Sequence, residues 1–260
     1  MNNQRFLSCA VVLAGVATLV MWAGSLRAKH WNSGLSTNSH GPINSCDDLD
    51  FNFDDHEAVR TEDHFNLPSS ASPLEVTAAM NGGLEVIGWD GKGYDIAACK
   101  AAAAEDLLKD VSISTQSGRV TAHGPAGDNW TVYFIIKAPN DSAMHLEAHN
   151  GPIALRNIGA KIEARSVNGP ISLKDVTGEV AAQTQNGPIS LEGSGGNLQL
   201  ETQNGPISVA VAGANWSSGE VTARTHNGPL DLRLPDNFTS GVRVEMSGHC
   251  PLRHWAAHVG

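Results

Sequence analysis

The tetrapeptide Asn-Gly-Pro-Ile occurs at residues 150–153, 168–171, 186–189 and 204–207, which places four copies 18 residues apart. A near-copy, Asn-Gly-Pro-Leu at residues 227–230, follows after a spacing of 23. A fixed period of this length is typical of stacked supersecondary units, each of which buries its apolar face against the next unit. The chain is therefore predicted to be a repeat protein.

Each repeat contains two short segments in which apolar and polar residues alternate. In the second repeat Ile171 and Leu173 alternate with polar residues, and after the next glycine Val180 and Ala182 do the same. Alternation with a period of two is typical of a strand buried on one face. The apolar positions recur in three columns, which are Ile153, Ile171, Ile189 and Ile207, then Leu155, Leu173, Leu191 and Val209, then Ile162, Val180 and Leu198. We therefore predict an all-β fold, a parallel β-solenoid of 18-residue, two-strand repeats with an aliphatic interior.

Two kinds of corner join the predicted strands. The first uses the asparagine-glycine pairs, which readily supply the positive φ of a sharp turn, and the following proline suits the first residue of a strand. Its residues are Asn150, Gly151, Asn168, Gly169, Asn186, Gly187, Asn204, Gly205, Asn227 and Gly228. The second corner is predicted at Gly159, Gly178 and Gly195-Gly196. The stacked asparagines either form a side-chain amide ladder or serve the turn alone, and both alternatives make them structural.

Two other folds are compatible with this period, and the residues disfavour both. A left-handed hexapeptide helix would repeat an aliphatic residue every six positions, but Gly159 and Lys161 stand six residues after Ile153 and Leu155. A calcium β-roll would carry a Gly-Gly-x-Gly-x-Asp nonapeptide, which the chain lacks. A flattened coil with two faces is therefore favoured, and no calcium ladder and no cofactor are predicted.

With these repeats the chain resembles the bacterial putative-adhesin family of β-strand-repeat proteins, a domain of unknown function. The resemblance rests on residues 169–173 (Gly-Pro-Ile-Ser-Leu) and 178–180 (Gly-Glu-Val), with cognate units from Leu74 to Met246, about two thirds of the chain. It implies a bacterial, exported scaffold and specifies no activity. Many members carry aspartate after the first glycine, where this chain has proline, so the resemblance carries over no ligand contact at that edge.

The N-terminal residues 1–28 are predicted to be a signal peptide or a signal anchor. Arg5 precedes an uncharged, mostly apolar run from Phe6 to Gly24, which is long enough to span a bilayer. We expect an exported protein, in the periplasm, on the outer surface or anchored facing outward, with the membrane contacted only through this segment. A net charge of −10 at pH 7 argues against nucleic acid as a partner.

Composition divides the rest of the chain into three parts. Residues 29–72 are rich in Asn, Ser, Asp and Pro and are predicted to be a flexible spacer, with a short strand at 48–54 that covers one end of the stack. Residues 73–248 form the β-solenoid domain in this prediction. Residues 249–260 are a C-terminal tail or cap.

The open end of a solenoid exposes unpaired strand groups and needs a cover. Residues 101–109 are predicted to form a short helix, and either this helix or a strand at 130–137 would cap the N-terminal end. The Asp-x-Asp-x-Asn spacing within 48–54 hints at a calcium loop. Phe53 and Val59 occupy the positions of the required glycine and glutamate, so a strand is preferred.

Three cysteines follow the leader, Cys46, Cys99 and Cys250. In an oxidising envelope two of them can pair. A bond between Cys46 and Cys99 would tether the spacer to the first strands, whereas one between Cys99 and Cys250 would tie back the tail. His254 and His258 would share a face if the tail were helical, but no second cluster with ligand spacing supports a metal site.

No catalytic site is predicted. A glycan-cleaving β-helix would need paired carboxylates on one outer face, and Glu163, Asp175 and Glu179 occupy different positions in their repeats. The chain contains no Gly-x-Ser-x-Gly, no phosphate loop and no His-Glu-x-x-His. Exposed charges on a solvated strand face are the simpler explanation of these carboxylates.

The insertion at residues 212–218 breaks the period by five and carries Asn215 and Trp216. Insertions in solenoids map to loops on one face and often carry binding. An exposed Trp216 would suit a sugar ring or a partner protein, and the alternative is that it folds over its own coil. A second contact surface is predicted from outward polar pairs, which are Gln185 with Gln203 and Thr184 with Thr202.

Together these features predict an exported, envelope-associated β-solenoid that acts as a non-catalytic, adhesin-like binding or structural module. An envelope glycan or a surface protein is the expected partner. The alternatives are a polysaccharide-active β-helix enzyme and a membrane-anchored accessory or sensor protein. An enzyme would lose turnover on substitution of a single carboxylate, whereas a binder would lose affinity only when a face is altered.

Overall fold

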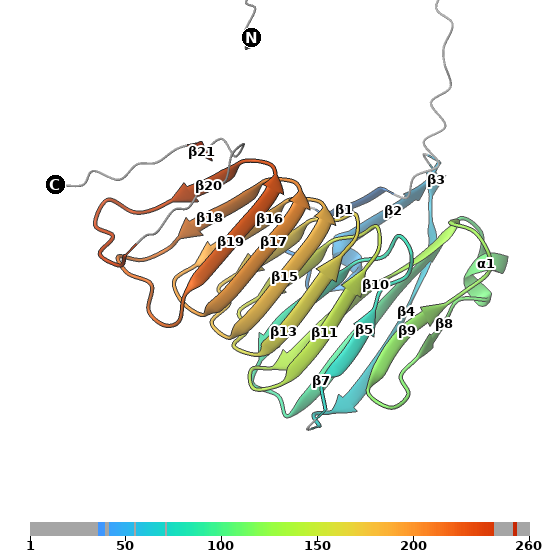
Figure 1. The fold of residues 1–260 in the computed structure, drawn as a ribbon. Coiled ribbons are helices and arrows are strands. Elements are labelled where there is room, and N and C mark those ends of the chain that lie inside the picture. The colour runs from blue at the N-terminus through green and yellow to red at the C-terminus, as the bar shows by residue number, and fades with distance from the viewer. Residues whose placement is uncertain (1–35, 40–41, 55, 71, 242–251, 254–260) are drawn as a thin grey trace, which may run out of the picture. The chain divides into compact units, whose positions relative to one another are not determined.

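The computed structural model describes residues 36–39, 42–54, 56–70, 72–241 and 252–253. Within these residues the chain forms a ten-stranded sheet, an eight-stranded sheet and a small three-stranded sheet. Figure 1 shows the strands of the two large sheets stacked in successive coils. The predicted leader lies outside the described residues. Among the described residues, no helix is long and apolar enough to cross a membrane.

The repeats form the predicted coils, and each coil places one strand in each large sheet. In the ten-stranded sheet these strands are β12 (Ile153–Arg156), β14 (Ile171–Lys174), β16 (Ile189–Gly193), β18 (Ile207–Val211) and β20 (Leu230–Arg233). In the eight-stranded sheet they are β11 (Ala143–Ala148), β13 (Lys161–Ser166), β15 (Glu179–Asn186), β17 (Asn197–Asn204) and β19 (Val221–Asn227). Neighbouring coils pair in parallel, which confirms the predicted β-solenoid.

The predicted apolar columns fill the space between the two sheets. Ile171 pairs in register with Ile153 on one side and Ile189 on the other, and all three are at most 1% exposed. The columns of Leu173 and Val180 are buried in the same way. Burial of aliphatic surface in this continuous core is the main stabilising contribution to the stack.

The N-terminal half departs from the simple coil. The strands β5 (Leu74–Thr77) and β6 (Leu84–Trp89) start the two parallel stacks. Beyond β6, the ten-stranded sheet continues with β10 (Trp130–Pro139), β7 (Gly93–Ala102) and β4 (Val59–Pro68), of which β7 and β4 pair antiparallel. Beyond β5, the eight-stranded sheet continues with β9 (Arg119–His123) and β8 (Ser112–Ser114). At this end both sheets are therefore extended by further strands, and β4 and β8 are the edge strands.

The predicted short helix is present at this end, but its predicted bounds and the predicted capping role of residues 130–137 are wrong. The helix predicted over residues 101–109 is α1 (Glu105–Lys109) alone, because Ala101 and Ala102 belong to β7 and are fully buried. Strand pairing with β10 and β4 overrides the helix propensity of the alanines. The strand predicted at 130–137 is β10, but it lies inside the sheet between β6 and β7 and so does not cap it.

The predicted flexible spacer is largely folded. Within residues 29–72 the structure contains β1 (Ser36–Ser39), the 3-10 helix η1 (Cys46–Asp48), β2 (Leu49–Phe53), β3 (His56–Glu57) and β4. The strand predicted at 48–54 is present as β2, but it does not cover an end of the stack. Its buried side chains Leu49, Phe51 and Phe53 form a second apolar cluster with Tyr133 and Ile135 of β10. The segment therefore covers the outer face of the ten-stranded sheet.

The asparagine-glycine corners turn without the predicted positive φ, which is found at none of their residues. Glycine is required there for space. A Cβ built on Gly169 would lie 2.1 Å from the carbonyl oxygen of Gly151 in the preceding coil, closer than any real side chain can approach. Positive φ occurs at the second corner instead, at Asn157, Asp175 and Gly196.

Candidate functional site

The outer face of the eight-stranded sheet carries an open groove of about 410 Å³ centred on Ala181 of β15. In each strand, the residues between the buried positions point outward. Ala181 is one of these outward residues, and its side chain is smaller than those of Glu163 and Gln199, its register partners on the two neighbouring strands, which leaves a hollow. The groove is lined by Lys161, Ile162, Glu163, Glu179, Val180, Ala181, Asn197, Leu198, Gln199, Glu220, Thr222 and Arg224. We call this hollow the Ala181 groove.

Contacts of acidic with basic side chains, within one strand and between coils, lie at one end of the Ala181 groove. The Nζ atom of Lys161 lies 3.0 Å from Oε1 of Glu179 in the next coil. The carboxylate of Glu163 lies 3.3 Å from Nη2 of Arg165 and 3.4 Å from Nδ1 of His145. Exposed pairs of this kind contribute little to stability, so their main effect is to order the side chains.

The other end of the Ala181 groove has charges available to a ligand. Arg224 is exposed and forms no ion pair with another described residue, and the same holds for Glu220. Between the two ends, Asn197, Gln199 and Thr222 offer amide and hydroxyl groups that both donate and accept hydrogen bonds. The groove can therefore bind a polar, hydroxyl-rich molecule at several points along the stack.

An asparagine ladder runs along one corner of the solenoid. The side-chain Nδ2 of each asparagine donates to Oδ1 of the asparagine in the preceding coil, at 3.0 Å from Asn168 to Asn150 and 2.8 Å from Asn186 to Asn168. The ladder continues through Asn204 and Asn227 at 2.9 Å each. Of the two alternatives left open by the sequence, the structure shows the ladder, and it extends to Asn81 in the first coil.

Threonine hydroxyls brace the same corner from inside. Thr184 and Thr202 are buried, and their Oγ1 atoms donate to the carbonyl oxygens of Gly169 and Gly187 at 3.1 and 3.0 Å. The prediction that these threonines form an outer contact surface is therefore wrong. Strand parity places them among the inward positions, where the glycine carbonyls satisfy their hydroxyls. Gln185 and Gln203 are exposed as expected.

The insertion that carries Trp216 folds back on its own coil. The Nε1 atom of Trp216 donates to the carbonyl oxygen of Gly196 at 2.9 Å, and its backbone nitrogen donates to Oγ of Ser240 at 3.0 Å. The ring is half-buried and packs against the main core, while Asn215 is exposed. The structure therefore shows the second of the two alternatives, in which Trp216 folds over its own coil, and a binding role of the insertion stays a prediction.

Beside Trp216, the end of the stack has an open hollow of about 800 Å³, lined by both polar and apolar residues of the last coil, such as Val221, Arg224 and Leu232. The strand β21 (Leu252–Arg253) pairs with β20 beside it. Cys250, His254 and His258 of the predicted tail lie outside the described residues.

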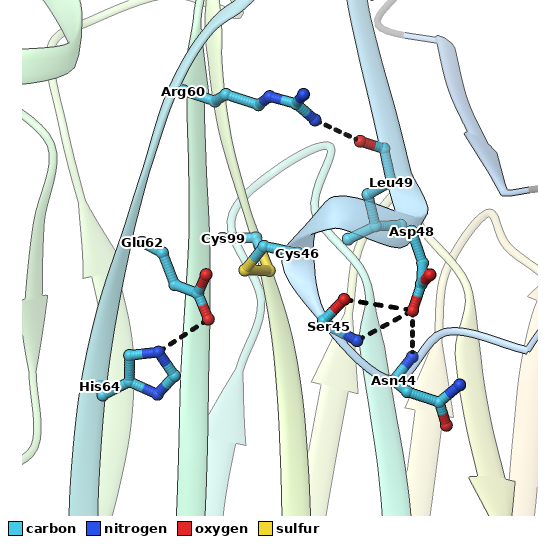
Figure 2. The surroundings of a disulfide bond; sticks show 9 residues. All are labelled: Asn44, Ser45, Cys46, Asp48, Leu49, Arg60, Glu62, His64 and Cys99. Atoms are coloured by element: carbon cyan, nitrogen blue, oxygen red, sulfur yellow. Dashed lines mark hydrogen bonds and ion pairs between the residues drawn. A yellow bond between two sulfur atoms is a disulfide. The ribbon is translucent and has the colours of Figure 1, made fainter.

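A disulfide joins Cys46 of η1 to Cys99 of β7, across 53 residues (Figure 2). The carboxylate of Asp48 accepts hydrogen bonds from the backbone nitrogens of Asn44 and Ser45 at 2.8 and 3.0 Å, which lowers the pKa of Asp48 below its ordinary value. Arg60 donates to the carbonyl oxygen of Leu49 at 3.0 Å. The disulfide and the Arg60 hydrogen bond fasten residues 42–54, which we call the N-terminal segment, to the ten-stranded sheet, while the Asp48 contacts order its turn.

A buried ion pair lies under the same segment. Arg156 of β12 donates to the carboxylate of Glu85 on β6, whose side chain is 4% exposed. Burial raises the pKa of Glu85, and the Arg156 guanidinium opposes that shift. Arg156 also donates to the carbonyl oxygen of Ile43 at 2.6 Å, so one side chain ties β6, β12 and the N-terminal segment together.

The structure brings two of the three carboxylates considered for catalysis to one place. Glu163 and Glu179 both line the Ala181 groove, while Asp175 lies at the second corner. Among the described residues, no group of three or more histidine, cysteine, aspartate or glutamate side chains could hold a metal ion. Sequence reasoning missed the groove, although counting outward positions along the columns would have placed Ala181 between larger side chains.

No protein-family model matches the chain, and no curated protein matches it. Several solved structures are similar to the chain, among them the following two. One is a putative cell adhesion protein from Clostridium sporogenes, which is 12% identical, covers 67% of this chain and 99% of that one, and has a TM-score of 0.36. The other is a putative adhesin from Bacteroides fragilis, at 9% identity, 67% and 97% coverage and a TM-score of 0.35. Both are of the kind that the repeats resemble, but at these scores we transfer no activity from them to this chain.

Proposed function

We propose that this protein is an extracytoplasmic, non-catalytic binding module that contacts an envelope glycan through the Ala181 groove. The observation that carries the proposal is the groove itself, an open polar hollow that crosses several coils on the outer face of the eight-stranded sheet. Repeated coils provide a long, rigid surface, and rigid elements position contact residues better than loops do.

The disulfide supports the location. Disulfides persist in oxidising compartments and are rare in the cytosol, and both Cys46 and Cys99 are buried in a structural cluster. An extracytoplasmic site agrees with the predicted export segment at residues 1–28. Whether that segment is cleaved or anchors the protein decides between a free module and a membrane-attached accessory protein.

The chemistry of the Ala181 groove favours a glycan over an apolar ligand. Its outward side chains are amides, a hydroxyl and charged groups, with Gln199 and Thr222 flanked by Arg224. Sugar hydroxyls both donate and accept hydrogen bonds, which such groups can satisfy in pairs. The free Arg224 guanidinium adds a point that can bind an acidic sugar.

A second candidate function, glycan cleavage, is favoured by one observation, the presence of Glu163 and Glu179 in the same groove. Glycosidases use a pair of carboxyl groups, one as a proton donor. Here each carboxylate is bound by a basic side chain, Glu179 by Lys161 and Glu163 by Arg165. Binding is therefore the preferred function.

The test incubates the exported protein with a panel of envelope glycans and records bound protein and released reducing ends together. Ala181→Tyr should fill the groove and abolish binding, while Ser172→Tyr, on the outer face of the ten-stranded sheet, is the matched control. Arg224→Ala should weaken the binding of acidic glycans more than the binding of neutral glycans. If reducing ends are released by the parent protein but not by the Glu179→Gln variant, the protein is a glycan-cleaving enzyme instead. Equal binding by parent and Ala181→Tyr would exclude the groove as the contact site.

A further inference from the structure

Every asparagine of the ladder is followed by glycine, in six pairs that begin with Asn81-Gly82 and end with Asn227-Gly228. An asparagine-glycine pair is chemically labile, because the backbone nitrogen of glycine can attack the side-chain carbonyl carbon of asparagine with no side chain in the way. The attack forms a carbon–nitrogen bond and expels ammonia, which leaves with the proton of the glycine nitrogen. Water then opens the cyclic imide to aspartate or isoaspartate.

The fold itself requires these reactive pairs. A Cβ on Gly151, Gly169, Gly187, Gly205 or Gly228 would lie between 1.9 and 2.3 Å from the carbonyl oxygen of the glycine in the preceding coil. Any other residue would push the coils apart at every corner. The asparagine is equally required, because its amide supplies both the donor and the acceptor of the ladder.

The ladder also holds the reacting groups in place. The Nδ2 atom of Asn204 is bound to Asn186, and the backbone nitrogen of Gly205, which would be the nucleophile, donates to the carbonyl oxygen of Asn227 at 3.0 Å. Gly187 donates in the same way to Asn204 at 3.1 Å. Attack at Asn186 or Asn204 therefore needs the corner to open first, and the side chain of Asn168 is held by ladder bonds to both Asn150 and Asn186. Local opening is rarest in the well-buried middle of a fold.

The last described coil is packed less tightly than the others. Its inward residues Val221, Ala223 and Leu230 are half-buried, whereas the equivalent residues of the preceding coil, among them Leu198 and Ile207, are at most 1% exposed. Asn227 and Asn168 are both exposed, so the difference between the two sites lies in the packing of their coils. Less buried apolar surface means a smaller free energy of local opening for this coil.

We propose that Asn227 is a site of spontaneous deamidation in the folded protein, and that the inner asparagines of the ladder react only when their coils unfold. The product at position 227 is a carboxylate, which cannot donate to Oδ1 of Asn204 as the amide does at 2.9 Å. One ladder bond is lost and a charge is added. The modification therefore loosens the last coil further and proceeds inward from this end.

Trypsin separates the two informative sites. Cleavage at the basic residues that flank each corner releases residues 166–174, which contain Asn168 alone, and residues 225–233, which contain Asn227 alone. The full chain is incubated in ¹⁸O-water at neutral pH, folded or in concentrated urea, and the labelled acid in each peptide is measured over time. In the folded protein, Asn227 should be modified about tenfold or more faster than Asn168. A factor of ten corresponds to a difference of about 1.4 kcal/mol in the free energy of local opening. In urea the two rates should converge.

A substitution in the last coil tests whether its looser packing sets the rate at Asn227. Leu232→Ala removes apolar packing from the last coil and should speed the reaction at Asn227 in folded protein, with no change at Asn168. Equal rates at Asn168 and Asn227 in the folded protein would overturn the proposal. The proposal would also be overturned if Asn227 were modified no faster than Asn168 in the folded Leu232→Ala variant. Neither readout depends on glycan binding.

Discussion

Arg156 donates a hydrogen bond to Glu85, a residue 71 positions earlier in the chain, and the same guanidinium donates to the carbonyl oxygen of Ile43 at 2.6 Å. One side chain therefore contacts both the solenoid and the N-terminal segment, in addition to the disulfide and the apolar cluster. The Glu85 carboxylate beneath it is 4% exposed, so it has almost no access to water. Removing its partner leaves a buried charge without compensation.

We expect Arg156→Ala to lower the free energy of unfolding by about 3 kcal/mol, because breaking one partner of a buried pair costs more than the pair contributes. Replacing both residues, as Arg156→Met with Glu85→Leu, should cost less than the single change. Urea unfolding of the three proteins measures both values. If the Arg156→Ala protein were as stable as the parent, the Glu85 carboxylate would have to be solvated in solution.

The disulfide should stabilise the fold by restricting the unfolded chain. Closure of a 53-residue loop corresponds to about 4 kcal/mol in the chain-entropy description. We expect the paired change Cys46→Ser with Cys99→Ser to lower the melting temperature and to release the N-terminal segment first. Hydrogen exchange should then rise in β2 while β15 stays protected. Uniform exchange across both strands would contradict an independent N-terminal unit.

Ile171→Asp should unfold the stack, because an unpaired carboxylate would lie between two coils at a position that is fully buried. The neighbouring Ser172→Asp points outward and is the matched control, with an expected change within about 0.5 kcal/mol. Circular dichroism on heating distinguishes the two. An Ile171→Asp protein that melts like its parent would mean that this column does not face the core.

Gly187→Ala tests the steric role of glycine at the corners. Its Cβ would lie 2.3 Å from the carbonyl oxygen of Gly169, so the coils must separate, at a cost of about 1–3 kcal/mol. At Gly213 the nearest atom is 3.7 Å away, and Gly213→Ala should be nearly neutral. The measurement is the difference between the urea-unfolding midpoints of the Gly187→Ala and Gly213→Ala proteins. Equal midpoints would mean that the corner relaxes freely.

The lowered pKa of Asp48 predicts a pH dependence for the N-terminal turn. Because the folded-state pKa lies below the ordinary value of 3.8, this contribution to stability is present above that value. It is lost as the pH falls through the folded-state pKa. Asp48→Asn should abolish this acid transition, which backbone exchange at Asn44 and Ser45 can follow. Persistence of the transition in the variant would assign it to another carboxyl group.

The coils from Ala143 to Arg233 were predictable because their stability is local. The 18-residue period and the alternation within each repeat specify which side chains meet, since every coil packs only on its neighbours. Ile171 can therefore be assigned to the core from the sequence alone. The groove residues are outward positions of the same pattern, but which of them form a hollow depends on side-chain size across three coils.

The sequence by itself determined the repeat, the inward columns and the asparagine-glycine corners of this protein. The tertiary structure alone settles how the chain before Ala143 folds, because parallel and antiparallel pairs mix there and several are long-range, as between β4 and β7. It also selected the partner of Cys99 and placed Thr184 inside the corner. Contacts between distant segments depend on sheet order and side-chain packing in three dimensions, and no periodicity along the chain records them.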